Sequence, residues 1–330
     1  MCNPHLYAMI FNPLNYFSRA CTSCLVIFAF VFFGISLNTA AQTSTEFWFA
    51  PPELTQGHGG TGNIYVRLAA GDAGATVTID MPANPGALNG GSPITVVLTP
   101  NQSQTVDLTS FINDLETRPQ ATILNTGLHI SSTEDITAIY EAGPNNNVDI
   151  WALKGSNGLG TEFYVPMQNL WPQGNYSPNP YTSFDIVATE DNTTILIYPT
   201  SDLDEPNGGN GAANGEPAFQ SFTITLDRGE TYSAAVTDRN NPENNPSGSI
   251  ILSDKPIAVS IKDDSISPPS QGCREAVGDQ IVPVDIVGNE YIVNQGGLNS
   301  GSGEYAYVIA TANNTQIFVD GVLETTLFNA

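Results

Sequence analysis

Positively charged side chains are rare in this chain. It has 9 Lys and Arg against 33 Asp and Glu over 330 residues, which gives a formal net charge of −24. So acidic a surface keeps a protein soluble and repels nucleic acid and anionic membranes. We therefore exclude nucleic acid as a partner. The same charge would attract divalent cations, but general solubility is the simpler interpretation.

Histidine is also scarce, with three residues in the chain. His58 lies in a Gly-rich loop and His129 in a strand-like segment, and no Gly-x-Ser-x-Gly elbow accompanies them. Catalysis by a Ser-His-Asp set is therefore not expected. Glycosidase chemistry with two carboxylates stays open because 33 acidic residues offer many pairs, although most such pairs arise by coincidence.

Long hydrophobic runs are absent apart from one close to the N-terminus. An apolar run at residues 24–35 follows Arg19, and small residues at 39–41 precede Gln42. This order is typical of a signal peptide, which we place at residues 1–41. A run of about a dozen residues is short for a bilayer span, which needs roughly 20. We predict an exported protein, secreted or on the cell surface, with no stable membrane insertion after removal of the signal.

Cysteine is nearly absent from the predicted mature part, residues 42–330. Cys2, Cys21 and Cys24 leave with the signal peptide, and Cys273 is left alone. An internal disulfide is then impossible, and zinc sites of the Cys-x-x-Cys kind are excluded. Packing and hydrogen bonding must therefore stabilise the fold.

Helix-compatible sequence is limited to a turn or two at residues 108–116, whereas alternating, strand-like runs recur throughout. Five segments share one hairpin pattern and begin at residues 63, 127, 183, 248 and 305. The steps between them alternate (64, 56, 65 and 57 residues), so a unit of about 120 residues overlies one of about 60. A second hairpin type lies between them. The sequence therefore predicts an all-β fold of repeated hairpins.

Two architectures fit these repeats. Two hairpins in each unit of about 60 residues give four strands, which is typical of a β-propeller blade. Tandem β-sandwich domains of about 120 residues are the alternative, and the longer period also appears in three matching segments at 45–49, 161–165 and 289–293. We favour the propeller because both hairpin types recur at the shorter period. Residues 323–328 begin another hairpin, so we expect the repeat domain at 42–330 to be truncated at its C-terminal end.

Several short motifs occur in order along the second half of the chain. They are Ser-Asp-Lys-Pro-Ile-Ala-Val at 253–259, Asp-Asp-Ser at 263–265, Gly-Cys at 272–273, Gly-Asp-Gln-Ile-Val-Pro-Val at 278–284 and Gly-Asn-Glu-Tyr-Ile-Val at 288–293. Together with Glu-Phe-Trp-Phe-Ala-Pro at 46–51, they resemble the N-terminal domain of the IgGFc-binding protein family. The resemblance covers residues 45–330.

This resemblance implies an extracellular, non-catalytic binding or adhesion module whose partner is a protein or a glycan. Similar regions occur in mucosal animal proteins named for binding the Fc part of IgG. They also occur in large surface proteins of Bacteroidetes-type bacteria, which look like adhesins exported by type IX secretion. The family carries over no set of binding residues. Two other classes stay open: a carbohydrate-active enzyme with paired carboxylates, and an architectural segment of a large surface protein.

The densest polar cluster beside predicted strands contains Asp263, Asp264, Ser265, Asp279 and Gln280. Polar side chains on the loops of a rigid scaffold are a candidate recognition site. The alternative is structural, because Asp carboxylates in loops commonly accept backbone N–H bonds and fix the loop. We favour the structural interpretation.

An aromatic loop is a second candidate binding site. Trp171, Tyr176 and Tyr181 lie in a stretch rich in Pro and Asn. Such rings supply a large contact area with a polar tip, which suits contact with a protein or a glycan. Packing of the rings against neighbouring hairpins fits the sequence equally well.

One acidic loop is a candidate calcium site. Asp202, Asp204, Glu205 and Asn207 place hard oxygen ligands close together, as calcium prefers. The twelve-residue loop with a closing Glu is missing, so a solvated insertion is the simpler interpretation. Apart from this possible calcium ion, the sequence implies no cofactor.

Overall fold

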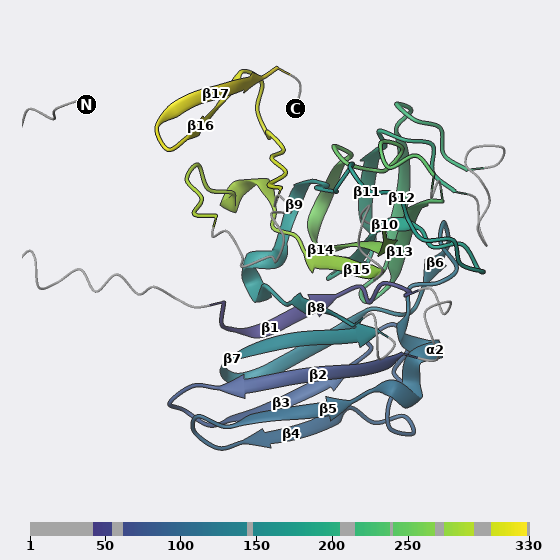
Figure 1. The fold of residues 1–330 in the computed structure, drawn as a ribbon. Coiled ribbons are helices and arrows are strands. Elements are labelled where there is room, and N and C mark those ends of the chain that lie inside the picture. Colours follow the sequence, from purple (N-terminus) through teal and green to yellow (C-terminus); the bar gives the residue numbers. More distant parts are fainter. Residues whose placement is uncertain are drawn as a thin grey trace, which may run out of the picture. The chain divides into compact units, whose positions relative to one another are not determined.

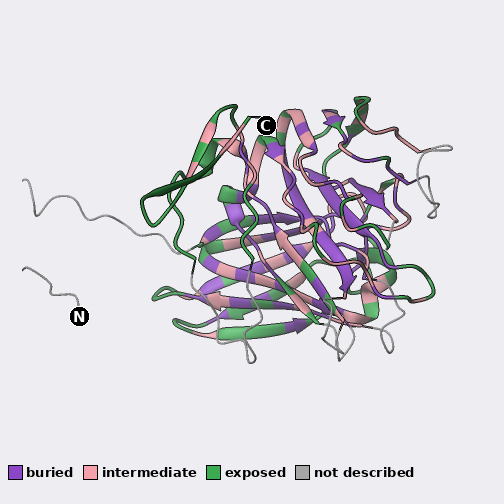
Figure 2. Ribbon diagram, turned by 45° about the horizontal axis from the view of Figure 1, so that its top comes forward, coloured by how far each residue is buried: buried purple, intermediate pink, exposed green. Residues whose placement is uncertain are grey.

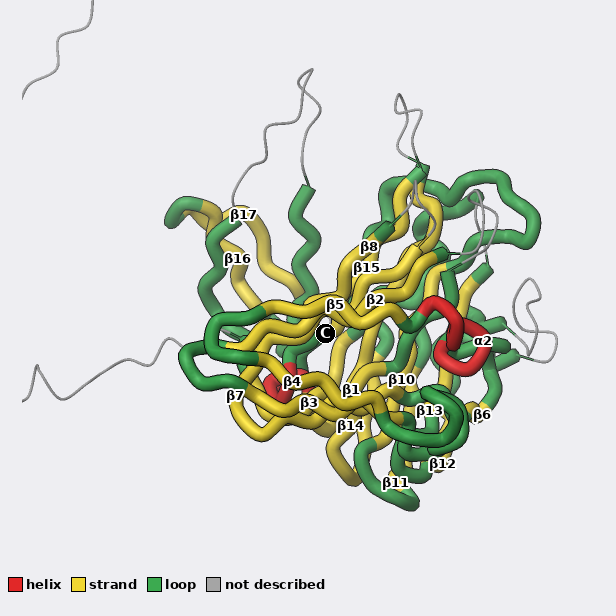
Figure 3. Tube along the Cα trace, turned by 90° about the horizontal axis from the view of Figure 1, so that it is seen from below, coloured by secondary structure: helices red, strands yellow, loops and turns green. Residues whose placement is uncertain are grey.

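The structure is a computed structural model, and it describes residues 42–54, 62–143, 148–204, 215–237, 240–267, 274–293 and 305–328. Strands dominate it, and helix is confined to short turns (Figure 3). The predicted all-β class is confirmed. The short helical segment near Phe111 is confirmed as well, because a 3-10 turn at Thr109–Phe111 leads into α2 (Ile112–Leu115).

The first unit is a seven-stranded sheet with the order β4-β3-β7-β2-β5, in which β1 and β8 also pair with β7 (Figure 1). The long strand β7 pairs with β1 and β3 mainly through its first half, and with β2 and β8 through its second half. One strand therefore joins two four-stranded groups. The strands are β1 (Ser44–Phe49), β2 (Asn63–Ala70), β3 (Ala75–Asp80), β4 (Ile94–Leu98), β5 (Ser103–Asp107), β7 (Leu128–Gly143) and β8 (Asp149–Ala152).

The second unit repeats this plan with the order β12-β11-β14-β10-β13, in which β9 and β15 also pair with β14, and the short β6 is added beside β13. Its long strand β14 again pairs with β9 and β11 mainly through its first half, and with β10 and β15 through its second half. The strands are β6 (Ile123–Leu124), β9 (Leu159–Tyr164), β10 (Thr182–Ala188), β11 (Thr193–Tyr198), β12 (Phe222–Leu226), β13 (Thr231–Val236), β14 (Ile250–Ile266) and β15 (Glu275–Gln280).

Strands are present at the predicted repeats, and the strand order recurs with the longer of the two periods, about 120 residues. This is the period on which the tandem-sandwich interpretation rests. A third segment continues the series with the hairpin β16 (Thr315–Val319) and β17 (Val322–Leu327). Further 3-10 turns lie at Gly155–Gly158 and Val284–Ile286.

The predicted pairing within the repeats is wrong. Strands β2 and β3 do not pair with each other, nor do β10 and β11, and the segments that begin at residues 127 and 248 each form one long strand, β7 and β14. The hairpins observed instead are β3 with β4, β11 with β12, and β16 with β17.

Alternation along each strand builds one apolar core per unit. In β2, for example, Ile64, Val66 and Leu68 are buried while Arg67 between them is exposed. Both four-stranded groups contribute to each core, which buries most of the strand length (Figure 2). A smaller apolar cluster joins the units, in which Trp48 and Ala50 pack with Val187 and Ala258. This contact positions the polar groups described next.

Candidate functional site

The predicted polar cluster is divided by the end of strand β14. The pairing of β14 with β15 shifts between Asp263 and Ile266, and Ser265 adopts a positive φ of 61° there. Such an irregularity is a bulge, which re-aims the side chains beside it. Asp263 faces a small surface pocket, whereas Lys262 lies on the opposite face of the strand, between the two units. Residues adjacent in sequence thus belong to two different sites.

The Asp263 carboxylate is the centre of the pocket. Oδ2 accepts a hydrogen bond from Gln168 Nε2 at 2.6 Å, and Oδ1 accepts bonds from Gln173 Nε2 at 2.8 Å and Thr182 Oγ1 at 3.1 Å. Burial raises the pKa of Asp263 to about 6, although these three donors work against the rise. The carboxylate is therefore occupied with holding the loop at residues 168–173.

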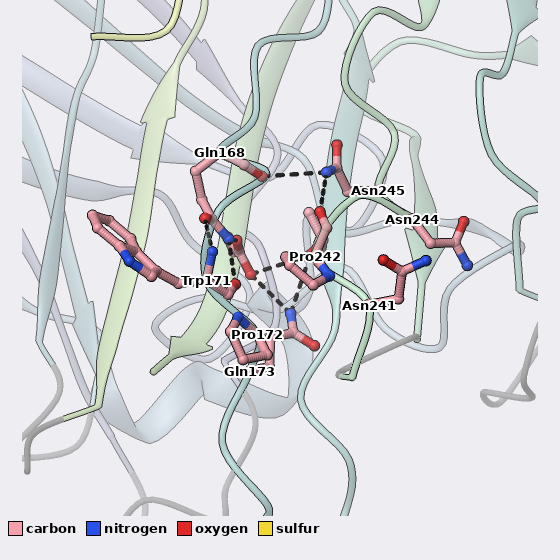
Figure 4. Close-up of a pocket in the computed structure, with 10 residues that line it drawn as sticks. Gln168, Trp171, Pro172, Gln173, Asn241, Pro242, Asn244 and Asn245 are labelled. Atoms are coloured by element: carbon pink, nitrogen blue, oxygen red, sulfur yellow. Dashed lines mark hydrogen bonds between the residues drawn. The ribbon is translucent and has the colours of Figure 1, made fainter. Parts of the chain in front are cut away.

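That loop and a second, Asn-rich loop form the pocket walls (Figure 4). Gln168 anchors its own loop, because its Oε1 accepts the backbone N–H of Trp171 at 2.9 Å. The Asn245 amide crosses between the loops and donates to the carbonyl of Gln168 at 3.2 Å. The space enclosed is about that of a single water molecule. The pocket is thus a shallow, amide-lined depression rather than a cleft for a whole substrate.

Trp171 is the aromatic residue that lines this pocket, and Tyr176 and Tyr181 follow it in the chain. The Trp171 ring meets Tyr305 edge to face, with 5.7 Å between the ring centroids. The ring of Tyr176 covers Gly174 so closely that a Cβ there would lie 2.6 Å from it. Both Trp171 and Tyr176 keep part of their surface open to solvent. Tyr181 differs, because it is buried and only 5% of its surface is exposed.

Between the units, a row of polar side chains covers one face of β10, β14 and β15. Ser260 Oγ donates to the carbonyl of Ala50 at 2.6 Å, and Gln280 Nε2 donates to the carbonyl of Trp48 at 2.6 Å. Gln280 Oε1 also accepts the backbone N–H of Lys154 at 2.6 Å. Buried backbone groups need such partners. The row therefore fastens the second unit to the end of β1, to Ala50 and to Lys154 after β8, and we call it the junction.

Charged groups complete the junction. Lys262 is fully buried, its Nζ lies 3.2 Å from the centroid of the Tyr181 ring, and the Asp264 carboxylate lies 3.9 Å away. Tyr181 donates its hydroxyl to Glu53 at 2.8 Å. Burial raises the pKa of Asp185, which shares this face, to about 7. The lysine thus has an aromatic face and a carboxylate as partners, in place of water.

From the first unit, Glu116 faces the same region. Its Oε1 accepts the backbone N–H of Leu54 at 3.3 Å, and its Oε2 lies 3.2 Å from Arg118 Nε. Burial raises the pKa of Glu116 to about 7, against the opposing effect of Arg118. At the outer edge of the junction, Lys154 Nζ binds both carboxylate oxygens of Asp279, at 2.8 and 3.0 Å. Glu116 and Asp279 are therefore both tied to protein partners here.

A comparison with models of protein families identifies the family to which the chain belongs. The IgGFc binding protein model matches residues 151–330, which is more than half of the chain. The chain belongs to the IgGFc binding protein family. Its match with this family includes the whole pocket and every junction residue contributed by the second unit. The family is one of binding modules, and the resemblance noted from the sequence is confirmed.

Other comparisons add little to the family match. No curated protein matches the chain significantly. Among solved structures, the Cowpea mosaic virus top component (naturally occurring empty particles) is 8% identical, covers 74% of this chain and 98% of its own, and has a TM-score of 0.20. A score this low does not indicate a shared fold. No helix of the described residues is both long and apolar enough to cross a membrane.

The candidate calcium ligands of this family member have protein partners where the structure describes them. Asp202 accepts the backbone N–H of Ala218 at 2.8 Å, and Asp204 accepts the hydroxyl of Thr237. Glu205 and Asn207 lie outside the described residues, as do His58 and Cys273. Within the described ranges, no group of three or more His, Cys, Asp or Glu side chains is placed to hold a metal ion.

Three junction residues escaped the sequence analysis. Asp185, Glu116 and Lys154 are buried polar groups that no motif singles out. One signal was present for Asp185, because a carboxylate between Phe184 and Ile186 interrupts an otherwise apolar strand. An acid in such a strand is almost never fully buried without partners. It therefore indicates a covered polar face.

Proposed function

We propose that the chain is an exported, non-catalytic binding module that recognises an extracellular protein or glycan with the loops around Trp171. The match of residues 151–330 to the IgGFc binding protein family carries this proposal. Within the matched region, Trp171 follows exposed Leu170 and lines the pocket with exposed Asn241, and Tyr176 is partly exposed on the same loop. Partly exposed aromatic rings beside amides are well suited to central contacts of an interface.

The disposition of the acids supports a role in binding rather than catalysis. Asp263 accepts three side-chain hydrogen bonds, and Asp279 is paired with Lys154. A two-carboxylate glycosidase needs one free acid and one free base across a substrate-sized gap. The pocket beside Asp263 holds about one water molecule, so it offers no such gap.

Binding can be tested with the immobilised chain against the Fc fragment of IgG and a glycan array. For any probe that binds, we expect Trp171→Ala to weaken the affinity at least tenfold, because buried aromatic anchors dominate interfaces. Phe219→Ala is the matched control, since that ring is 82% exposed and lies outside the loop. Equal losses from both variants, or turnover of an array glycan, would contradict the proposal.

A second candidate is an architectural segment of a large surface protein. The junction favours it, because Gln280 and Asp279, two predicted site residues, fasten the second unit to Trp48 and Lys154 of the first. Failure of every probe to bind, together with cooperative unfolding of both units, would support this candidate over the first.

Export is part of the same proposal. We infer that the signal peptide is removed after Ala41. The N-terminal sequence and intact mass of the secreted chain test this inference.

A further inference from the structure

Strands β4 and β12 are edge strands at the same place in their units. Each stands at the first end of its strand order, and among the described residues each pairs with one neighbour alone, β3 or β11. Figure 1 shows β4 at the outer edge of the first unit. Because both units leave this edge open, the open edge is part of the plan of a unit.

Most other strands that pair with a single neighbour contain an acidic residue. This holds for β1, β5, β8, β9 and β15. In a chain with a net charge of −24, such a residue repels a second copy that approaches the edge. Strands β4 and β12 contain no charged residue. None occurs between Asp80 and Asp107, so β4 lies in a long neutral stretch, whereas Asp227 and Arg228 follow β12 directly.

The two uncharged edges also differ in an exposed side chain. Val97 of β4 lies opposite Thr76 and is 68% exposed. The equivalent residue of β12 is the polar Thr225, which lies opposite Thr194. A β-branched apolar side chain packs well against the side chains of a neighbouring strand. Strand β4 therefore offers both an open backbone edge and an apolar contact to an added strand.

The side-chain pattern of β4 is complementary to itself. Val96 is its middle residue, Ile94 and Leu98 at the two ends pack on the same core, and Thr95 and Val97 are exposed. If two copies of β4 pair antiparallel about Val96, Thr95 of one copy lies opposite Val97 of the other. Because side chains alternate between the faces, the core-facing residues of both copies then lie on one face of a continuous sheet. Such a two-fold contact uses the same surface on both copies.

We propose that the edge of β4 is a self-association site, to which β4 of a second copy adds as an antiparallel strand. Main-chain hydrogen bonds supply the affinity, and the contact of Val97 with Thr95 of the other copy fixes the register. An interface of two short strands is small, so the dimer is weak and reversible. The two-fold contact uses the edge on both copies, so assembly stops at two. The loops around Trp171 belong to the second unit, so this inference does not depend on the proposed function.

Sedimentation velocity and amide hydrogen exchange of the whole chain, measured over a series of concentrations, test the proposal. We expect a monomer–dimer equilibrium in which exchange of Ile94–Leu98 slows by about tenfold as the dimer forms. Val97→Asp adds a carboxylate to the edge and should weaken the dimer by at least about tenfold. Because Val97 is 68% exposed, this variant should keep the unfolding midpoint of the parent chain.

Thr225→Asp is the matched control, since it adds the same charge at the equivalent position of β12. It should leave the dimer unchanged. Equal weakening by both variants would attribute the effect to net charge and overturn the proposal. A chain that stays monomeric at every concentration would overturn it as well, and so would a dimer in which exchange of β4 does not slow. Species larger than a dimer would contradict the two-fold pairing.

Discussion

Each unit has a pair of charged residues at equivalent positions on the same face of its sheet. The pair is exposed to solvent in the first unit and buried in the second. Arg67 lies opposite Thr105 and diagonal to Glu141, just as Asp185 lies opposite Ser233 and diagonal to Lys262. In the first unit, the Arg67 guanidinium donates to both carboxylate oxygens of Glu141, at 2.6 and 2.9 Å, and both side chains are in contact with solvent. In the second unit, Asp185 and Lys262 are completely buried.

The neighbours explain this difference. Around Asp185 the face consists of small residues, including Ser183, Ser233 and Ala235, so the first unit can approach closely. Around Arg67 the face presents Tyr65, Thr105 and exposed Ile150 instead. An exposed ion pair contributes little to stability, whereas a buried charge depends on every partner it has. The same backbone thus serves as a surface in one unit and as an interface in the other.

Removal of the buried lysine should have the largest effect. Lys262→Met keeps the length of the side chain but leaves Asp185 and Asp264 buried without their cation. We expect a loss of about 3–5 kcal/mol in unfolding free energy, as for other broken buried pairs. Urea unfolding monitored by tryptophan fluorescence measures it. The matched control is Glu141→Gln, and a comparable loss there would show that the two sites do not differ as argued.

The buried acids should make the junction sensitive to pH. Burial raises the pKa of both Asp185 and Glu116 to about 7, so the folded chain holds protons that the unfolded chain releases near pH 4. Stability should therefore fall as the pH rises from about 4 to 7, by about 1.4 kcal/mol per pH unit for each group, and level off above.

Unfolding measured between about pH 5 and pH 8 checks this prediction. Asp185→Asn keeps the shape but cannot ionise, so the slope of stability against pH should become shallower. If Asp185→Asn retained the full slope, burial of Asp185 would not be its source.

Close packing at the junction should show a smaller effect. A Cβ at Gly278 would lie 2.5 Å from Trp151 Nε1 and 2.6 Å from the carbonyl of Ile261, which that Nε1 donates to. Gly278→Ala should therefore cost about 1–3 kcal/mol through overpacking. Gly71→Ala is the control, since nothing lies within 4 Å of its added Cβ. Equal melting temperatures for the two variants would argue against a tight junction.

Much of the fold was predictable because it depends on local patterns. The match of residues 183–198 with 305–320 located two equivalent strands, β11 and β16, since alternation and turn residues are written in the sequence. It gave them the wrong partner, because each pairs with the strand that follows it, β12 or β17. The division of the cluster at Asp263 and Asp264 was not foreseen. It follows from the alternation of side chains along β14, which puts Asp263 on one face and Lys262 and Asp264 on the other, whereas the sequence analysis placed these acids in a loop.

The junction was beyond sequence reasoning for a different reason. Ser260 and Ala50 are 210 residues apart, and Gln280 and Trp48 are 232 apart. Nothing local in a strand tells which of its faces a distant unit covers. Gln280 and Asp279 have protein partners, which agrees with the structural interpretation of these residues. The burial of Lys262 against Tyr181 can be explained only when both units are considered together.

The smallest effect on stability is expected when the exposed pair of the first unit is replaced by the charged residues of the buried pair. The double variant Arg67→Asp with Glu141→Lys gives the first unit the acid and the lysine that the second unit has at these positions. Because both side chains keep contact with solvent, the unfolding midpoint should stay within measurement error of the parent chain. The opposite exchange, Asp185→Arg with Lys262→Glu, forces a larger cation into a space bounded by Ser183 and Ser233, and should unfold the chain. Circular dichroism with temperature compares the two double variants directly. Similar melting temperatures for both would contradict the argument that burial by the neighbouring unit decides which charged side chains these positions tolerate.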